Sequence, residues 1–383
     1  MRFGFLLGAS LEQIKRTLPL ILLLRQPDFS ASCSDNQVHC DRDRGSEANC
    51  WKAHSQVAEY STAQDMAAAK ANSGLLLYYN EYSFYSQKVV LALYEKNLLF
   101  DTHDIDLNGE QYKPWFLQIN PRGEVPVLQD TGKIIPDSAR IIDYLEDNFS
   151  NGHSPRLLPV DKGGELRQKI TYFRGIIDKI NGNVLTIGSL LHPELATGSK
   201  KVPFIAPVRK QLVNADKNSA TNLRKYAQDN PDAREMLLEK AENQEKKHEK
   251  MQNKEEFVAI LKETDKVFDE VEAELAQHAD KLNWWLCTDG FTVADVSLTI
   301  LLVRVNQIGM EPYFWTNGKR PHVERYFMRV QERDSYKKTV PTTFSLVKTI
   351  FKTQMPLIIG VSIAAAIALI VGGWFIVRKI MHK

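Results

Sequence analysis

Three short stretches in the first half of the chain place polar side chains where they could do chemistry. Ser83 stands after the apolar run at 75–79 and directly before a helical pattern, so its hydroxyl can cap that helix or contact a ligand there. Asp137 and Ser138 stand in the same way before a second helical pattern, where Ser138 is expected to cap the helix if it contacts no ligand. Pro126 lies inside an apolar strand pattern, where it removes a hydrogen-bond donor from the sheet and therefore requires an explanation.

Two explanations of Pro126 are open. A cis peptide bond between Val125 and Pro126 would turn the backbone outward and leave the Val125 N–H and C=O free to pair with an extended peptide ligand. Alternatively, the proline shapes a turn at an edge strand and contacts no ligand.

The elements around these residues follow one order. A strand, a helix, an alternating strand, a short helix, two strands and a final helix are expected at 75–79, 84–97, 99–107, 113–117, 124–129, 133–135 and from 137 onward. This order is a thioredoxin-like layout. We therefore predict an α/β thioredoxin-like N-terminal domain at 74–156.

The second half is predicted to be an all-α C-terminal domain at 157–340. Apolar residues recur at helical spacing over 257–275, as expected for a helix that faces a bundle core. Thr292 is expected to cap the next helix, with Asp295 returning a carboxylate to the helix start and Phe291 packing beneath it.

An insertion at 192–254 interrupts this helical domain. It begins with prolines and becomes dense in charged residues over 234–256. Few apolar residues occur in the run at 241–256, so no buried face is predicted for that run. Two interpretations are open: a solvated helix or loose arm, or an arm that binds a partner protein.

The chain begins with a leader at 1–73 that is predicted to be disordered, because most of it is polar and lacks periodicity. Too few cysteines are present for a disulfide scaffold, which indicates a reducing compartment; they are Cys33, Cys40, Cys50 and Cys287. No metal site is expected, because the spacing of the first three with His39 and His54 matches no zinc pattern.

The last part of the chain is predicted to anchor it in a membrane. Residues 357–377 form an uncharged apolar stretch without proline, long enough for one C-terminal transmembrane helix. Only the basic tail at 378–383 follows, so a tail-anchored, single-pass protein with its N-terminal body in the cytosol is expected. Residues 341–356 are predicted to form an amphipathic juxtamembrane segment, with a last helix of the body as the alternative.

Charge and small residues extend this expectation. The chain carries only basic charges from residue 335 onward, although its net charge is +2, so the remaining body is mildly acidic. This balance argues against nucleic acid as a partner and fits an anionic membrane surface. Arg378, Lys379 and Lys383, which follow a moderately hydrophobic span, are the predicted membrane-targeting residues.

A stripe of small residues within the span recurs every four positions, at Gly360, Ala364, Ala368 and Gly372. Such a stripe lets two membrane helices approach closely, which favours a homodimer. The alternative is that the small residues only lower the hydrophobicity of the span for targeting.

Several motifs resemble one superfamily. Tyr-x-x-x-Ser before a helix, Asn-Pro-x-Gly-x-Val-Pro-Val-Leu and Asp-Ser-x-x-Ile-x-x-Tyr-Leu resemble the N-terminal half of a glutathione transferase, and 290–298 resembles the capping motif of its C-terminal half. More narrowly, the terminal apolar segment and the stretches at 191–195, 285–287, 291–298 and 317–321 look like the ganglioside-induced differentiation-associated protein family. The resemblance covers roughly residues 74–383.

The resemblance implies a glutathione transferase fold and a role for each polar stretch. Ser83 becomes the candidate catalytic donor to the glutathione sulfur, with Ser86 as second choice. Val125 and Pro126 would present backbone to the cysteinyl part, and Asp137 with Ser138 would hold the γ-glutamyl part. Two departures are visible: Asp137 is one methylene shorter than the usual Glu or Gln, and the insertion begins where a second substrate would sit.

The family resemblance implies a tail-anchored protein of the outer mitochondrial membrane that promotes mitochondrial fission and network dynamics through cytosolic protein partners. No cofactor is implied, with glutathione as a candidate ligand. The alternative is a membrane-tethered glutathione transferase that conjugates glutathione to electrophiles, and the enzymatic question is open at this level.

Overall fold

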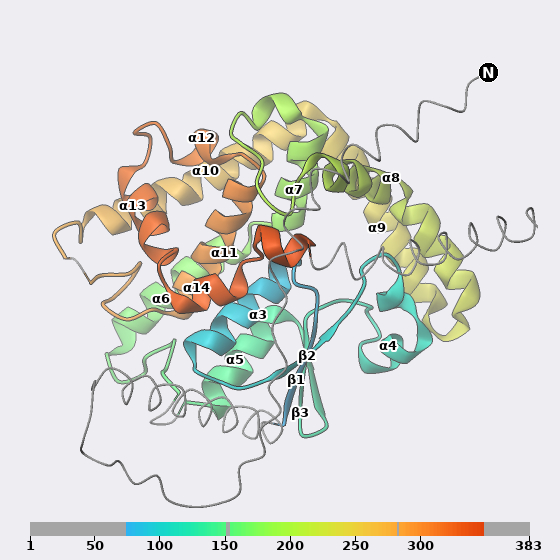
Figure 1. Cartoon of the computed structure of the whole chain (residues 1–383), viewed down its shortest axis with the longest axis horizontal. Helices are drawn as coiled ribbons and strands as arrows, with labels where there is room; N and C mark the ends of the chain where they lie inside the picture. Colours follow the sequence, from blue (N-terminus) through green and yellow to red (C-terminus); the bar gives the residue numbers. More distant parts are fainter. Residues whose placement is uncertain (1–73, 151–153, 282, 348–383) are drawn as a thin grey trace, which may run out of the picture. The chain divides into compact units, whose positions relative to one another are not determined.

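A four-stranded sheet forms the centre of the N-terminal half (Figure 1). This computed structural model describes residues 74–150, 154–281 and 283–347. The strands lie in the order β2-β1-β3-β4. Strands β1 and β2 are parallel, whereas β3 is antiparallel to both β1 and β4. Their bounds are Leu75–Tyr79 for β1, Asp101–Asp104 for β2, Val127–Asp130 for β3 and Lys133–Pro136 for β4.

The two faces of the sheet bury alternate side chains, because successive residues of a strand point to opposite sides. Leu77 and Leu128 join the main core, which includes residues of α3 (Phe84–Glu95) and α5 (Ser138–Asn148). Tyr78 and Val127 pack on the other face with Phe116 of α4. Helix α4 spans Pro114–Ile119 and follows a short 3₁₀ turn, η2, at Glu110–Tyr112.

The predicted order of elements in this half is confirmed, with one correction. The stretch 99–107 was expected to be a half-buried strand, but β2 covers four residues and all four are exposed. The buried apolar side chains, Phe100 and Ile105, flank the strand instead. The reason is that β2 is an edge strand that pairs only with β1.

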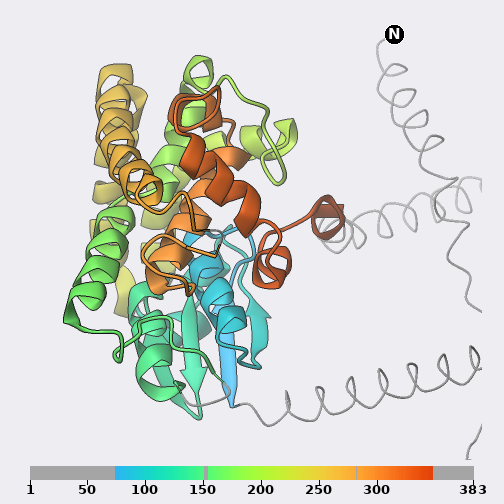
Figure 2. The ribbon, with the colours of Figure 1, turned by 90° about the vertical axis from the view of Figure 1, so that its left-hand side faces the viewer.

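Helix α11 (Val293–Gln307) organises the helical half, and all but one of its residues are buried. It contacts α6 and α7 of the helical half and also α3, the first helix of the N-terminal half, so it joins the two halves (Figures 1 and 2). The other elements are α6 Gly164–Asp178, α7 Gly182–Leu191, η3 Pro193–Leu195, α8 Ala206–Asp229, η4 Pro231–Ala233, α9 Arg234–Gln252, α10 Lys254–Ala276, α12 Glu311–Phe314, α13 Pro321–Val330 and α14 Asp334–Thr339.

The predicted cap of α11 is confirmed. The Asp295 carboxylate accepts hydrogen bonds from the Thr292 N–H at 2.9 Å and from the Thr292 hydroxyl at 2.6 Å. It also accepts from the Leu286 N–H and the Tyr326 hydroxyl, each at 2.9 Å. Phe291 is buried as expected. The carboxylate therefore joins the start of α11 to α13 as well as closing its own helix.

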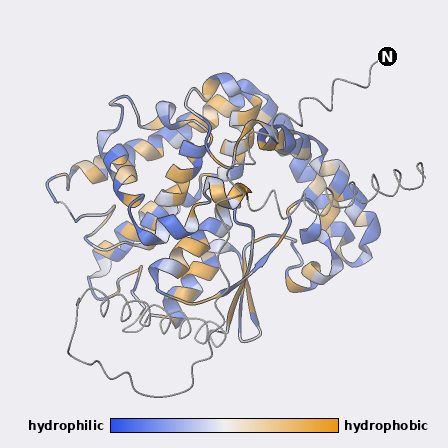
Figure 3. Cartoon of the chain, in the orientation of Figure 1, coloured by the Kyte–Doolittle hydropathy of each residue, from blue (hydrophilic) through white to orange (hydrophobic). Residues whose placement is uncertain are grey.

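The insertion contains two long helices, α8 and α9, which pack against each other and are mostly hydrophilic (Figure 3). The prediction that 241–256 has no buried face is wrong, because Ala241 and Met251 of α9 are buried. Ala241 and Leu237 of α9 form a small separate core with Ala220, Leu223 and Ala227 of α8. Three alanines and two leucines are enough to close this two-helix interface, and so few apolar side chains give little signal in the sequence.

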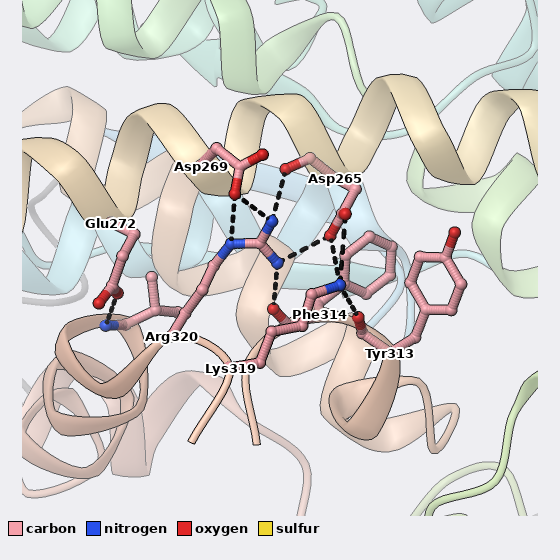
Figure 4. A network of polar contacts seen from close by, with 8 residues as sticks. Asp265, Asp269, Glu272, Tyr313, Phe314, Lys319 and Arg320 are labelled. Carbon is pink, nitrogen blue, oxygen red and sulfur yellow. Dashed lines mark hydrogen bonds and ion pairs between the residues drawn. The ribbon is translucent and has the colours of Figure 1, made fainter. Parts of the chain in front are cut away.

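A charged network fastens α10 to the loop that precedes α13 (Figure 4). The buried Arg320 guanidinium donates to Asp265 at 2.7 Å and to Asp269 at 2.5 Å. Lys319 donates to Asp265 at 3.0 Å. Glu272, one turn further along α10, accepts from the Val323 N–H at 2.9 Å at the start of α13.

Helix α14 is fastened to α3 by a second network. The Arg333 side chain, just before α14, donates to both carboxylate oxygens of Glu95 at 2.7 and 2.5 Å. The Ser335 hydroxyl also donates to this carboxylate. Glu95 belongs to the last turn of α3, so the end of the helical half is bonded to the first helix of the chain's body.

Most predictions for the two ends of the chain fall outside the described residues. These are the leader at 1–73, the anchor at 357–377 with its small-residue stripe, and the basic tail at 378–383. Among the described helices, none is long and apolar enough to span a membrane. Of the juxtamembrane segment, residues 343–347 are helical, with Phe344 80% exposed and Leu346 buried.

Candidate functional site

Strand register brings the three predicted stretches to one end of the sheet. Tyr78 in β1 pairs with Val127 in β3, and Val127 pairs with Pro136 in β4. The loop to Ser83 therefore leaves the sheet at the end where residues 125–126 enter and where 137–138 leave. This end of the sheet, with these three stretches, is called the sheet-end site below.

Ser83 is the N-cap of α3, and its Oγ accepts a hydrogen bond from the Ser86 N–H at 3.3 Å. The side chain is half-buried, so part of it stays accessible to a ligand. Ser86 is fully buried, and its Oγ accepts from the Asn80 N–H at 3.4 Å. The second choice, Ser86, therefore supports the Ser83 turn and does not face a ligand.

The peptide bond between Val125 and Pro126 is cis, as the first explanation of Pro126 requires. Within the described part of the chain, the Val125 N–H and C=O have no hydrogen-bond partner. The preceding loop is held by Asn120, whose side-chain amide donates to the Glu124 C=O at 2.8 Å. This backbone is thus free to pair with the backbone of a peptide-like ligand.

Asp137 and Ser138 divide their roles differently from the simplest expectation. Asp137, not Ser138, is the N-cap of α5, and its Oδ1 accepts from the Ala139 and Arg140 N–H groups at 3.0 and 3.1 Å. It adopts a positive φ of 76°, which is uncommon for a residue other than glycine. Ser138 is the first helical residue and is 7% exposed. A helix N-terminus of this kind favours a carboxylate ligand.

Tyr85 is a further hydroxyl near this site that the sequence reading missed. Burial raises the pKa of Tyr85, the negative charge of Asp178 adds to the rise, and Arg304 opposes it. The negative charges of Asp137 and Glu124 also act to raise the pKa of this hydroxyl. Its place in the first turn after Ser83 was the signal available in the sequence.

Arg304 of α11 is the second missed residue. Its guanidinium donates from Nη2 to the Tyr82 C=O at 2.9 Å and from Nη1 to the Thr186 hydroxyl at 3.0 Å. Burial lowers the pKa of Arg304 to about 10, so it is still protonated at neutral pH. The single basic residue in a largely apolar helix was the signal for it.

The α8–α9 hairpin is bonded to the loop that leads into the cis-proline. The Lys240 ammonium donates to the Arg122 C=O at 2.8 Å and to the Glu124 carboxylate at 2.7 Å. On α8, the Tyr226 hydroxyl donates to the Asn108 C=O at 3.3 Å. A cavity of about 470 Å³ lies beside these contacts, lined by residues 106–114 and the end of α8. The hairpin is therefore attached to the sheet-end site from outside.

Across the described ranges, no group of three His, Cys, Asp or Glu residues could hold a metal ion. Cys287 is buried, and its burial, with the nearby charges of Asp295 and Glu274, raises the pKa of its thiol. The other cysteines, with His39 and His54, lie outside the described residues.

Two family models match the chain. Residues 77–153 match the glutathione S-transferase N-terminal domain, and residues 232–334 match the glutathione S-transferase C-terminal domain. Among solved structures, the beta-etherase LigF from Sphingobium sp. strain SYK-6 is similar with a TM-score of 0.52 and 24% identity, covering 70% of this chain and 98% of that one. This likeness shows the glutathione transferase fold, with an N-terminal α/β domain and a C-terminal helical domain.

Two curated relatives are more similar in sequence. The human ganglioside-induced differentiation-associated protein 1-like 1 is 33% identical over 294 residues, which cover 72% of this chain and 79% of the relative. The mouse protein of the same name is 33% identical over 297 residues, with the same coverage. The chain belongs to the ganglioside-induced differentiation-associated protein family of the glutathione transferase superfamily.

Proposed function

We propose that this chain is a tail-anchored interaction protein of the outer mitochondrial membrane, which binds glutathione at the sheet-end site and promotes mitochondrial fission through cytosolic partners. The observation that carries the proposal is the attachment of the α8–α9 hairpin to the cis-proline loop through Lys240 and Glu124. A ligand that pairs with the Val125 backbone contacts the residue next to this ion pair. Occupancy of the site is thereby coupled to the position of the hairpin, which presents a charged surface to partners.

The membrane part of the proposal is supported by the sequence beyond residue 347. The apolar stretch at 357–377 supplies the anchor, the basic residues at 378–383 the mitochondrial destination, and the small-residue stripe the contact in a homodimer. Gly360→Leu combined with Ala368→Leu is expected to weaken self-association of the full chain in detergent without changing its targeting.

The ligand part is tested with the full-length chain purified in detergent. Titration with glutathione is expected to give saturable binding, and Val125→Pro, which removes the N–H, is expected to weaken it. Val160→Pro, at an exposed position away from the site, is the control for proline itself. Absence of any saturable binding by the unaltered chain contradicts the proposal.

A second candidate is the membrane-tethered glutathione transferase. It is favoured by one observation: the half-buried Ser83 hydroxyl lies at the start of α3, where a helix N-terminus and a donor favour a thiolate. Turnover of a general electrophile that is lost in Ser83→Ala would establish this enzyme. Saturable binding without turnover leaves the interaction protein.

A further inference from the structure

Arg304 is a buried cation directly behind the turn that carries Ser83. Its side chain is held on α11 and the residue is 3% exposed. Besides its bond to the Tyr82 C=O, its guanidinium lies over the Phe84 ring, 5.6 Å from the ring centroid. It thus contacts the residues on both sides of Ser83.

This charge has no ion-pair partner among the carboxylates that the structure describes. The nearby Lys88, whose ammonium lies 4.8 Å from the centroid of the same Phe84 ring, is paired with Asp178 at 2.5 Å. The fully buried Lys96 is paired with Glu146 at 2.7 Å. Arg304 differs from both, and its buried Nε has no hydrogen-bond partner.

The carboxylates around the site are each engaged elsewhere. The carboxylates that act on the neighbouring Tyr85 hydroxyl are Asp178, bonded to Lys88, Asp137, bonded to the start of α5, and Glu124, bonded to Lys240. Burying a charge without a counter-ion costs several kcal/mol, and groups held in this state are concentrated at functional sites. The geometry therefore points to an anion that is supplied from outside the chain.

We infer that Arg304 is a positioning residue that fixes the turn from Tyr82 to Phe84 and stabilises the thiolate of glutathione bound at Ser83. The inference rests on the proposed glutathione site. In this step the bound thiol releases its proton to solvent, and no other bond forms or breaks. The resulting negative charge on sulfur faces the Ser83 hydroxyl, and the guanidinium behind the turn supplies the counter-charge.

The experiment measures two quantities on the full-length chain in detergent. Binding of S-methylglutathione, which has no thiol, reports on the site alone, and the ultraviolet absorbance of the thiolate against pH gives the pKa of bound glutathione. Arg304→Gln is expected to keep the affinity for S-methylglutathione within about twofold and to raise the bound thiol pKa by about one unit, because an opposite charge is lost. Arg304→Lys is expected to keep the thiol pKa low.

A second pair of variants leaves Arg304 in place, in case its removal prevents folding. Thr186→Asp supplies a carboxylate beside Nη1 and is expected to raise the bound thiol pKa, whereas Thr186→Asn, of the same size without charge, is expected to leave it unchanged. An unaltered thiol pKa in Arg304→Gln or Thr186→Asp, with S-methylglutathione still bound, overturns the role of Arg304 alone. Failure of the unaltered chain to bind S-methylglutathione overturns the glutathione site and this role together.

Discussion

At the scale of single residues, the Asp137 carboxylate caps α5 and is also the group that the proposed glutathione site would offer to the ligand amine. Its Oδ1 is used by the cap of α5, and its backbone is held at a positive φ. Asparagine can replace it in both respects, because its side chain caps helices and it tolerates positive φ, whereas alanine does neither. Only the negative charge, which a ligand amine would need, differs between aspartate and asparagine.

We therefore expect two variants of this residue to separate the roles. Asp137→Ala should lower the free energy of unfolding by about 1–2 kcal/mol through the lost cap. Asp137→Asn should change it by less than about 0.5 kcal/mol and still weaken glutathione binding. Chemical unfolding and glutathione titration measure the two effects. Equal destabilisation by both variants would mean that the carboxylate charge, rather than the cap, holds the α5 start.

Sequence reasoning found part of the site at this scale. Ser83, Val125 and Asp137 could be predicted because helix starts and a proline inside a strand leave local signals. Ser138 was the expected cap of α5 and Asp137 is the observed one. Both residue types cap helices, and only the backbone angles decide between them. Arg304 lies more than 200 positions along the chain from Tyr82, and a contact between two such distant residues exists only in the folded chain.

At the scale of elements, the docking of the α8–α9 hairpin depends on a glycine. Gly109 has φ +133°, and a Cβ at this position would lie 2.1 Å from the Tyr226 hydroxyl oxygen. Gly109→Ala is therefore expected to displace Tyr226 and loosen the hairpin. Hydrogen–deuterium exchange should rise in α8 and α9 and stay unchanged in α11.

Gly132 offers the matched control for this prediction. It also has a positive φ, +96°, but nothing lies within 4 Å of the Cβ that a substitution would add. Gly132→Ala should therefore carry a similar backbone strain without any effect on the hairpin. Identical exchange in α8 and α9 for both variants would show that Tyr226 does not hold the hairpin.

The α10 network gives a pH dependence. Partial burial acts to raise the pKa of Asp265, but hydrogen bonds from Arg320 and Lys319 outweigh it and hold the pKa below the ordinary value of 3.8. A folded pKa below the unfolded one stabilises the fold above the unfolded pKa, and this contribution is lost as the pH falls through the folded pKa. The hydrogen bonds from Arg320 and Lys319 to the Asp265 carboxylate thus stabilise the folded protein at neutral pH and not in strong acid.

Asp265→Asn is accordingly expected to lower the free energy of unfolding at pH 7 by about 1–2 kcal/mol, the value of a hydrogen bond to a charged group. The difference from the unaltered chain should shrink below about pH 4, as measured by thermal unfolding across pH. Glu263→Gln, which breaks only the exposed pair with Lys266, is the control and should have little effect at any pH. A difference that stays constant down to pH 2 would contradict the assignment.

Elements with a strong apolar period were predictable, and the insertion was not. The order of strands and helices over 75–148 and the cap of α11 followed from local patterns. The buried side of α9 rests on Leu237 and Ala241 within a strongly charged sequence, so its small interface with α8 leaves almost no periodic signal. The length of β2 depended on its place at the sheet edge, which the sequence of the strand does not contain.

At the scale of the whole molecule, destination is predicted to depend on the basic end of the chain. Changing Arg378 and Lys379 together to Glu is expected to shift the protein from the outer mitochondrial membrane towards the endoplasmic reticulum, because positive charges beside a moderate span favour the mitochondrial surface. Imaging of tagged full-length protein measures the shift, with Lys383→Gln as a milder control. Unaltered mitochondrial rims in the double variant would refute it.

The bond between Glu95 and the Arg333–Ser335 segment has a mechanical consequence. Helix α14 ends at Thr339, a few residues before the described part of the chain ends at residue 347, and it packs on α3. A pulling force applied to the chain beyond residue 347 therefore acts on α3 through α14 and the Glu95 ion pair. Ser83 caps the start of α3, so tension on the C-terminal end and contact at the Ser83 turn act on opposite ends of one helix.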